Sequence, residues 1–267
     1  MNIFRFEMRR NFRTFLIWTI SIALFVGYML SVYQTSFAGA GKGMEEFMKM
    51  FPESMRKAFG MDRLDLTTLL GYFGTEVHCM ILLFGAMYAA LLSSSLLSKE
   101  ENDKTVEFLL ARPITRTEMV TQKLMAFVAY VVLFIGATWG TSYVAMEVYV
   151  KSVYDARAFW LLGGMTLLAI LAVACLGFLG SVFVTRNRAV YSASLGFVLG
   201  LYALQIVADI SEKARFLRYV TPFKWASAAD ILPTGKVDAV YLGITVAVIA
   251  LSVAGSYVAY GRKDITV

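Results

Sequence analysis

The sequence predicts an all-α integral membrane protein with six transmembrane helices, and three observations support this fold class. Of the 267 residues, 58% are hydrophobic and only 16% are charged, which is far from the composition of soluble domains. The mean hydropathy is +0.65. Six stretches are apolar over about 20 residues, the length that a helix needs to cross the hydrocarbon core. Helices of this length use roughly half of the chain and leave no room for a catalytic domain.

We expect one transmembrane domain over residues 1–267, with spans at about 15–37, 72–97, 123–146, 158–184, 189–208 and 239–260. The first apolar stretch, of about 23 residues, exceeds the 7 to 15 residues of a signal-peptide core, so we interpret it as a retained span. The leader before it interleaves four arginines with apolar and aromatic residues. This pattern predicts an N-terminal interfacial helix, and ordinary flanking charge is the alternative.

Six spans place both termini on the same side of the membrane. Lysine and arginine divide almost evenly between the two sides, so their positions decide the orientation. Four arginines precede the first span closely, and the tight turn at residues 186–188 carries two arginines and no acid. We therefore expect a multi-pass protein of the cell (plasma) membrane with both termini in the cytoplasm.

The first long outer segment, residues 38–71, predicts a pair of amphipathic helices. Apolar residues recur at spacings of 3 and 4 between Met44 and Phe59. Pro52 cannot occupy an unbroken helix interior, so a second helix starts there and ends at Gly60. These helices lie on the outer membrane face, and a role in gating a substrate path is left open.

The second long outer segment, residues 209–238, predicts another short outer-face helix. Thr221 and Pro222 are typical of a helix start, and the helix is expected to run through about Ile231. Lys224 and Trp225 fit an interfacial anchor at headgroup depth.

The segment between the second and third spans, residues 98–118, has nine charged residues among 21. Val106, Leu109 and Leu110 form one apolar face, and Pro113 ends the helix. The pattern Thr115-x-x-Glu118 is a capping box that begins the third span. We predict a short amphipathic helix on the cytoplasmic membrane surface. Amphipathicity does not name a partner, so a helix that only anchors the loop is the alternative.

These residues resemble the cytoplasmic loop of ABC-2 type permeases, the membrane subunits of one class of ATP-driven exporter. The similar run is Thr105-x-Glu107-x-Leu109-Leu110-x-x-Pro113-x-x-Arg116, followed by Lys123-Leu124. The ending Tyr260-Gly-Arg-Lys-Asp264-Ile265 is similar to the C-termini of that family. The resemblance extends over the whole chain in length, span number and loop order. Lys104 departs from the glycine that the family often has there.

The resemblance implies that the short helix is a coupling helix that docks on a separate cytoplasmic P-loop ATPase, which binds ATP and Mg. It implies two ATPases and a second permease, either a copy of this chain or a homologue. It also implies that the N-terminal helix is the family's connecting helix. The residues that it assigns to the coupling helix are Thr105, Val106, Glu107, Leu109, Leu110, Arg112 and Pro113.

The resemblance further implies that the second and fifth spans lie near a central cavity, with the loop before the last span closing its outer side. Residues chosen from helix position as possible cavity lining are Phe73, Met80, Phe84, Met87, Phe197 and Gln205. Glu76 in the second span is either structural or part of a substrate path. Ser192, Gly196 and Gly200 form a small-residue stripe for helix packing, within the subunit or between two permeases.

The sequence predicts no catalytic residue, cofactor or metal ligand in this chain. The nearest match to a phosphate-binding loop has Ser36 in place of its first glycine and Gly43 in place of the magnesium-binding Ser or Thr. His78 and Cys79 are adjacent on one helix and point about 100° apart. Cys79 and Cys175 lack metal-ligand spacing. We attribute the net charge of +6 to helix flanks and membrane lipid, not to nucleic acid.

The function predicted from the sequence is therefore that of a permease subunit in an ATP-driven ABC exporter of a hydrophobic or amphipathic substrate, such as a drug, peptide antibiotic or lipid. One alternative is an ATP-independent channel or secondary transporter, which would need paired ionisable residues near the midplane. Another is a membrane scaffold that recruits a cytoplasmic protein.

Overall fold

The computed structural model describes residues 3–37, 50–97, 115–150, 153–183 and 187–263. Within these residues every regular element is a helix, and six helices are long and apolar enough to cross a membrane, which confirms the predicted fold class. The spans consist of α1 and η1 (Ile3–Val32, Tyr33–Phe37), α4, η2 and α5 (Leu69–Tyr72, Phe73–Val77, His78–Ser93), α8 and η3 (Arg116–Ala145, Met146–Val150), α9 (Ala156–Gly180), α10 (Asn187–Ile210) and α13 (Ala239–Arg262).

The N-terminal leader does not form a helix separate from the first span, so this part of the prediction is wrong. A single α-helix, α1, runs from Ile3 to Val32. The physical reason is that no proline occurs in this stretch and its first glycine is Gly27, so nothing in the leader breaks the helix. At 30 residues α1 is about 45 Å long, which exceeds the hydrocarbon core of about 30 Å. Its arginine-rich first turns therefore extend to headgroup depth.

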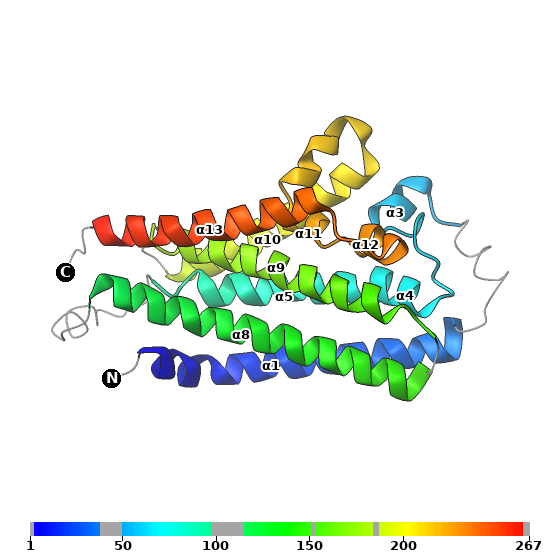
Figure 1. Ribbon diagram of the computed structural model, residues 1–267, viewed down its shortest axis with the longest axis horizontal. Helices are drawn as coiled ribbons and strands as arrows, with labels where there is room; N and C mark the ends of the chain where they lie inside the picture. The colour runs from blue at the N-terminus through cyan, green and yellow to red at the C-terminus, as the bar shows by residue number, and fades with distance from the viewer. Residues whose placement is uncertain (1–2, 38–49, 98–114, 151–152, 184–186, 264–267) are drawn as a thin grey trace.

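The long helices form a bundle in which both termini lie at the same end (Figure 1). We call this the terminal end and the opposite one the distal end. Helix α1 packs along α8, α13 packs along α9, and α5 contacts α9, α10, α8 and α1. Helices α5 and α9 are the most buried spans, whereas α1, α10 and α13 lie at the edges of the bundle.

Aromatic rings fill the core in its distal half. Trp139 on α8 contacts Phe73 and Phe159 with ring centroids 5.7 and 5.4 Å away, and its indole Nε1 donates to the Phe159 carbonyl at 3.3 Å. Gly163 makes this packing possible, because a Cβ there would lie 2.5 Å from Trp139 Nε1. Burial of these rings fixes α8 against α5 and α9.

Polar caps define where four of the spans begin, the first of them at Thr68, whose hydroxyl accepts from the Gly71 backbone N–H at 3.1 Å. The capping prediction for the third span is confirmed at Thr115, whose hydroxyl accepts from the Glu118 backbone N–H at 3.2 Å. Asp155 caps α9 and Asp238 caps α13 in the same way. Helix α8 consequently starts at Arg116, before the apolar run itself begins.

The distal end carries the short helices α3 (Glu53–Ala58), α11 (Pro222–Trp225) and α12 (Ala228–Thr234) and the 3₁₀ helix η4 (Glu212–Tyr219), which the sequence did not predict. Helix α3 corresponds to the second helix of the pair predicted in residues 38–71, whereas the first helix of that pair lies largely outside the described residues. Pro52 precedes α3, and Gly60 follows with a φ of +70° that favours glycine. The single helix expected from Pro222 to about Ile231 is instead two helices, because the chain turns at Ala226 and Ser227. Gly235, with a φ of +59°, ends the second of them.

Candidate functional site

At the terminal end, the first turns of α8 bind the last turn of α13. Arg116 donates from its guanidinium to the backbone carbonyls of Gly261 at 3.1 Å and Lys263 at 2.8 Å, with the Tyr260 carbonyl at 3.4 Å. The last carbonyls of a helix lack partners within the helix and carry partial negative charge, so a guanidinium is well suited to them. Arg116 thus connects the two regions of sequence that carry the family resemblance, the run that ends at Arg116 and the C-terminal run that starts at Tyr260.

The same part of α8 binds the end of α5. Lys123 is fully buried and donates to the carbonyl of Leu96, in the turn that follows α5. Residues 98–114 therefore connect two points that are both attached to α8, one through Lys123 and one directly at Thr115. The sequence resemblance includes Lys123, but its carbonyl partner lies 27 residues away and cannot be derived from the pattern.

Helix α8 also holds the start of α1. The Phe4 backbone N–H donates to Gln122 Oε1 at 3.1 Å, and the Tyr130 hydroxyl donates to the Met8 carbonyl. Glu7 is buried on the same turn, and Asn11 Nδ2 donates to Glu7 Oε2 at 3.1 Å. We name these contacts of α8 with α13, α5 and α1 the terminal junction.

The coupling-helix residues predicted from the sequence lie outside the described residues. The set is Thr105, Val106, Glu107, Leu109, Leu110, Arg112 and Pro113. The prediction for them stays a prediction, while the terminal junction shows what the flanks of this segment are attached to.

Within the membrane, α5 is buried except along one stripe. The side chains that are not fully buried are those of Glu76, in the preceding η2 turn, and of Cys79, Met80, Leu83, Phe84, Met87 and Leu91. At about 100° per residue these positions share one side of the helix. Tyr88 borders the stripe on one side, and the centroid of its ring lies 5.9 Å from that of Trp18 of α1. Cys79 lies at the other edge of the stripe and contacts Tyr202 of α10 at 3.3 Å.

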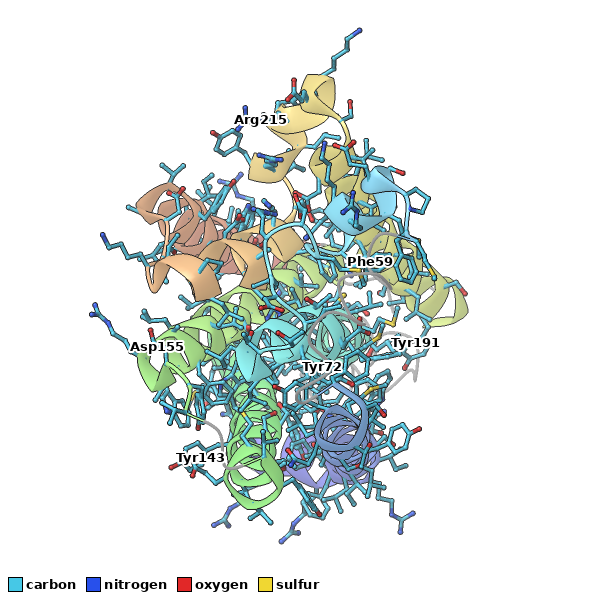
Figure 2. All side chains as sticks on the ribbon, turned by 90° about the vertical axis from the view of Figure 1, so that its right-hand side faces the viewer. Phe59, Tyr72, Tyr143, Asp155, Tyr191 and Arg215 are labelled. Carbon is cyan, nitrogen blue, oxygen red and sulfur yellow. The ribbon has the colours of Figure 1, made fainter. Side chains whose placement is uncertain are left out.

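The open stripe of α5 therefore lies between α1 and α10. Figure 2 looks at the distal end of the bundle and shows Tyr72 near the middle, with Tyr191 of α10 to its right and α1 below. Three of the six predicted cavity residues, Met80, Phe84 and Met87, lie on this stripe. Phe73 is instead fully buried in the aromatic core of the subunit.

Helix α10 places the remaining predicted residues in two environments. Phe197 is 43% exposed. Gln205 lines a small, partly open pocket of about 50 Å³ together with Thr75, His78 and Cys79. Among the described residues none hydrogen-bonds Gln205 Oε1, and the pocket is large enough for water. His78 is buried beside this pocket, with its Nε2 2.9 Å from the Thr166 hydroxyl.

The small-residue stripe of α10 faces away from the rest of the subunit. Ser192, Gly196 and Gly200 are exposed, and no described side chain would meet a Cβ added at either glycine. The sequence left open whether this stripe packs within the subunit. In the described structure it does not.

At the distal end, charged residues form a network that sequence reasoning missed. Lys224 of α11 is 2% exposed, and its Nζ lies 2.9 Å from both Asp209 at the end of α10 and Asp230 of α12. Arg63 pairs with Asp230, and Arg218 lies 3.7 Å from Asp209. We call these five residues the distal ion network. The sequence predicted Lys224 at the headgroups, and its burial corrects that expectation.

Asp230 shows the electrostatic balance of this network. Burial on its own raises the pKa of the Asp230 carboxyl, but Lys224 and Arg63 outweigh burial and hold the pKa below its usual value. Asp230 is therefore ionised at neutral pH and links α12 to both cations. Two signals in the sequence could have suggested the network: acids at the end of one span and in the next short helix, and a lysine between them.

Six spanning helices, a loop attached at both flanks to the third span, and a central helix open along one stripe define a multi-pass membrane protein of the permease class. The chain belongs to the ABC-2 transporter family, because the family model described as ABC-2 family transporter protein matches residues 1–265. No curated protein matches the sequence. Family membership makes this chain a membrane subunit of an ABC transporter and implies association with an ABC ATPase subunit.

Proposed function

We propose that this chain is one of two permease subunits of an ATP-driven exporter and that its substrate is hydrophobic or amphipathic. ATP and Mg bind to the partner ATPase and not to this chain. The observation that carries the proposal is the terminal junction. The segment that resembles a coupling helix enters α8 at Arg116, and the first turns of α8 bind the ends of α13, α5 and α1.

This arrangement supports transmission of force from an ATPase into the membrane. A push on residues 105–113 reaches α8 first. Because Arg116, Lys123 and Gln122 fix three other helix ends to α8, the terminal ends of four helices move together. Such rigid-body movement is what alternating access requires. Because the ATPase is cytoplasmic, the proposal puts the terminal end, with both termini, on the cytoplasmic side.

The open face between α1 and α10 supports pairing with a second permease. A substrate cavity between two subunits would be lined by the α5 stripe from each. The small-residue stripe of α10 would allow a second backbone to approach closely. The remaining exposed apolar surface of the spans contacts membrane lipid.

The test is affinity purification of the chain from gently solubilised native membranes, followed by mass spectrometry of the proteins that co-purify. Leu109→Asp places a charge on the predicted docking face and should abolish recovery of the ATPase while leaving membrane insertion intact. Met50→Asp is the matched control, because Met50 is 79% exposed at the distal end. It should recover the ATPase as well as the unmodified chain does.

Three outcomes contradict the proposal in different ways. Recovery of the ATPase with all three proteins would show that the docking face is placed wrongly. Recovery with none of them would favour a channel or a secondary transporter. An ATPase that binds but whose hydrolysis never responds to any transported compound in reconstituted vesicles would favour a scaffold.

A further inference from the structure

The open stripe of α5 carries one carboxylate, that of Glu76. Glu76 lies seven residues after Leu69, where the span begins, or about 10 Å along the helix. The span is 25 residues long, about 37 Å, so Glu76 lies inside the hydrocarbon core near its distal boundary. An ionisable group at this depth costs free energy unless a partner compensates it.

Glu76 has no such partner in the described part of the chain. No described residue forms an ion pair or a hydrogen bond with its carboxylate. Its titratable neighbours are Tyr72 and Cys79, and neither supplies a positive charge. The carboxylate is partly exposed on the stripe and can be reached from the open face. This contrasts with Asp209 and Asp230, whose charges the distal ion network neutralises.

The side chains next to Glu76 on the stripe suit a large apolar cation. Met80 and Met87 have flexible, polarisable thioethers that adapt to varied shapes. Phe84 is 36% exposed, and its ring can attract a cation through its face. The stripe has no lysine or arginine, so no fixed positive charge repels a cationic ligand.

We propose that Glu76, Met80, Phe84 and Met87 form a binding site for lipophilic cations, with Glu76 as the counter-ion. This inference rests on the proposed function and deepens it, because it names the class of substrate as hydrophobic compounds that carry one positive charge. Glu76 determines specificity for charge, and the three apolar side chains provide contact area.

The experiment compares two probes of nearly the same shape and opposite charge, tetraphenylphosphonium and tetraphenylborate. Their binding is measured by equilibrium dialysis against the full chain purified in a neutral detergent. The unmodified chain should bind the phosphonium about tenfold or more tightly than the borate. Glu76→Gln should weaken phosphonium binding by about tenfold and leave borate binding unchanged or stronger.

Two further variants keep the result interpretable. Glu76→Asp retains the charge and should retain the preference for the phosphonium. Glu212→Gln removes an exposed carboxylate of η4 and should bind both probes as the unmodified chain does. Gel filtration checks that each variant is folded. Glu76→Gln should elute as the unmodified chain does, because no described residue loses a partner when the charge of Glu76 is removed.

Equal phosphonium affinity in the unmodified chain and Glu76→Gln would overturn the proposal, and so would a preference for the borate. The assay contains no ATPase or ATP, so its failure is separate from failure of the proposed function. If the ATPase co-purifies but Glu76→Gln binds normally, the exporter assignment stands and the cation site is wrong. If binding depends on Glu76 and no ATPase is found, the cation site stands and the coupling to ATP is wrong.

Discussion

The two ends of the bundle are held together by different chemistry. At the terminal junction, side chains of α8 bind the backbone of other helices: Arg116 and Lys123 donate to carbonyls, and Gln122 accepts from a backbone N–H. At the distal end, the charged side chains of the distal ion network pair mainly with each other around Lys224. A bond to the backbone fixes the position of a helix itself, whereas a bond between two side chains fixes only their tips.

This difference indicates which end moves as a unit. Four helix ends share the terminal junction, so a displacement of one carries the others. The distal short helices are joined to the spans through the buried ion pairs, and a charged pair can exchange partners or meet water when the distal end opens. The proposed function therefore predicts that the terminal end transmits movement and that the distal end opens and closes.

The largest expected effect is at Lys224, because it is buried between two acids. Lys224→Met leaves the carboxylates of Asp209 and Asp230 without their shared cation. Removing one partner from a buried charge pair typically costs about 3 to 5 kcal/mol. We expect a clearly lower melting temperature of the detergent-solubilised protein, measured by intrinsic fluorescence.

The matched control for this experiment is Lys213→Met, which removes an exposed lysine of η4. It should leave the melting temperature within error of the unmodified chain. Adding Asp209→Asn to Lys224→Met should restore part of the loss, because one uncompensated charge is removed. If Lys224→Met melts like Lys213→Met, the distal ion network does not stabilise the fold.

The second effect is at Arg116 in the terminal junction. Arg116→Gln removes the charge-assisted hydrogen bonds to the end of α13, each worth about 1.5 to 3 kcal/mol. Because Arg116 is partly exposed, water replaces part of this loss, and the fall in melting temperature should be smaller than for Lys224→Met. We expect fewer substrate molecules transported per ATP hydrolysed in proteoliposomes, since α13 no longer follows α8.

Arg116→Lys separates the two contributions of this side chain. Lysine keeps the positive charge near the carbonyls but cannot reproduce the planar fork of donors. Arg116→Lys should restore the melting temperature more completely than it restores the number of substrate molecules transported per ATP hydrolysed. A normal transport ratio in Arg116→Gln would show that the terminal junction is structural and does not carry the coupling movement.

The sequence predicted the helices better than it predicted how they are joined. The spans are local properties: about 20 apolar residues, a Thr115 cap, and Gly60 and Gly235 at turns are visible within one window of sequence. The contacts that build the sites are not local. Arg116 reaches the carbonyl of Lys263, 147 residues away, and Arg63 reaches Asp230 across 167 residues. No periodicity indicates such pairs, so they emerge only from the fold.

Two of the wrong expectations, for the leader and for Lys224, have the same origin. The leader was interpreted from its charges, but α1 stays continuous because Gln122 and Tyr130 of a distant helix hold its first turns. Lys224 was interpreted as a headgroup anchor from its aromatic neighbours, but acids from α10 and α12 bury it. Charge patterns locate where a helix can leave the membrane, whereas partners in space decide whether a charged residue does so.

The smallest expected effect concerns the pH dependence of the distal end through Asp230. The folded-state pKa of Asp230 lies below its unfolded value, because Lys224 and Arg63 outweigh burial. Its contribution to stability is therefore complete above about pH 4 and is lost as the pH falls through the folded-state value. Asp230 is one of two acids paired with Lys224, so its protonation releases only part of the distal ion network.

The difference in melting temperature between two proteins separates the effect of Asp230 from the effects of the other carboxylates. Melting temperatures of the unmodified chain and of Asp230→Asn are compared from about pH 6 to about pH 3. Asp230→Asn should melt lower at pH 6, and the gap should shrink as the pH falls, because protonated aspartic acid resembles asparagine in charge. Glu212→Gln serves as the exposed control and should melt as the unmodified chain does at pH 6. A gap for Asp230→Asn that stays constant down to pH 3 would mean that hydrogen bonding, and not charge, accounts for the role of Asp230. The two ends of the bundle would then differ only in the geometry of their contacts, and charge would not distinguish them.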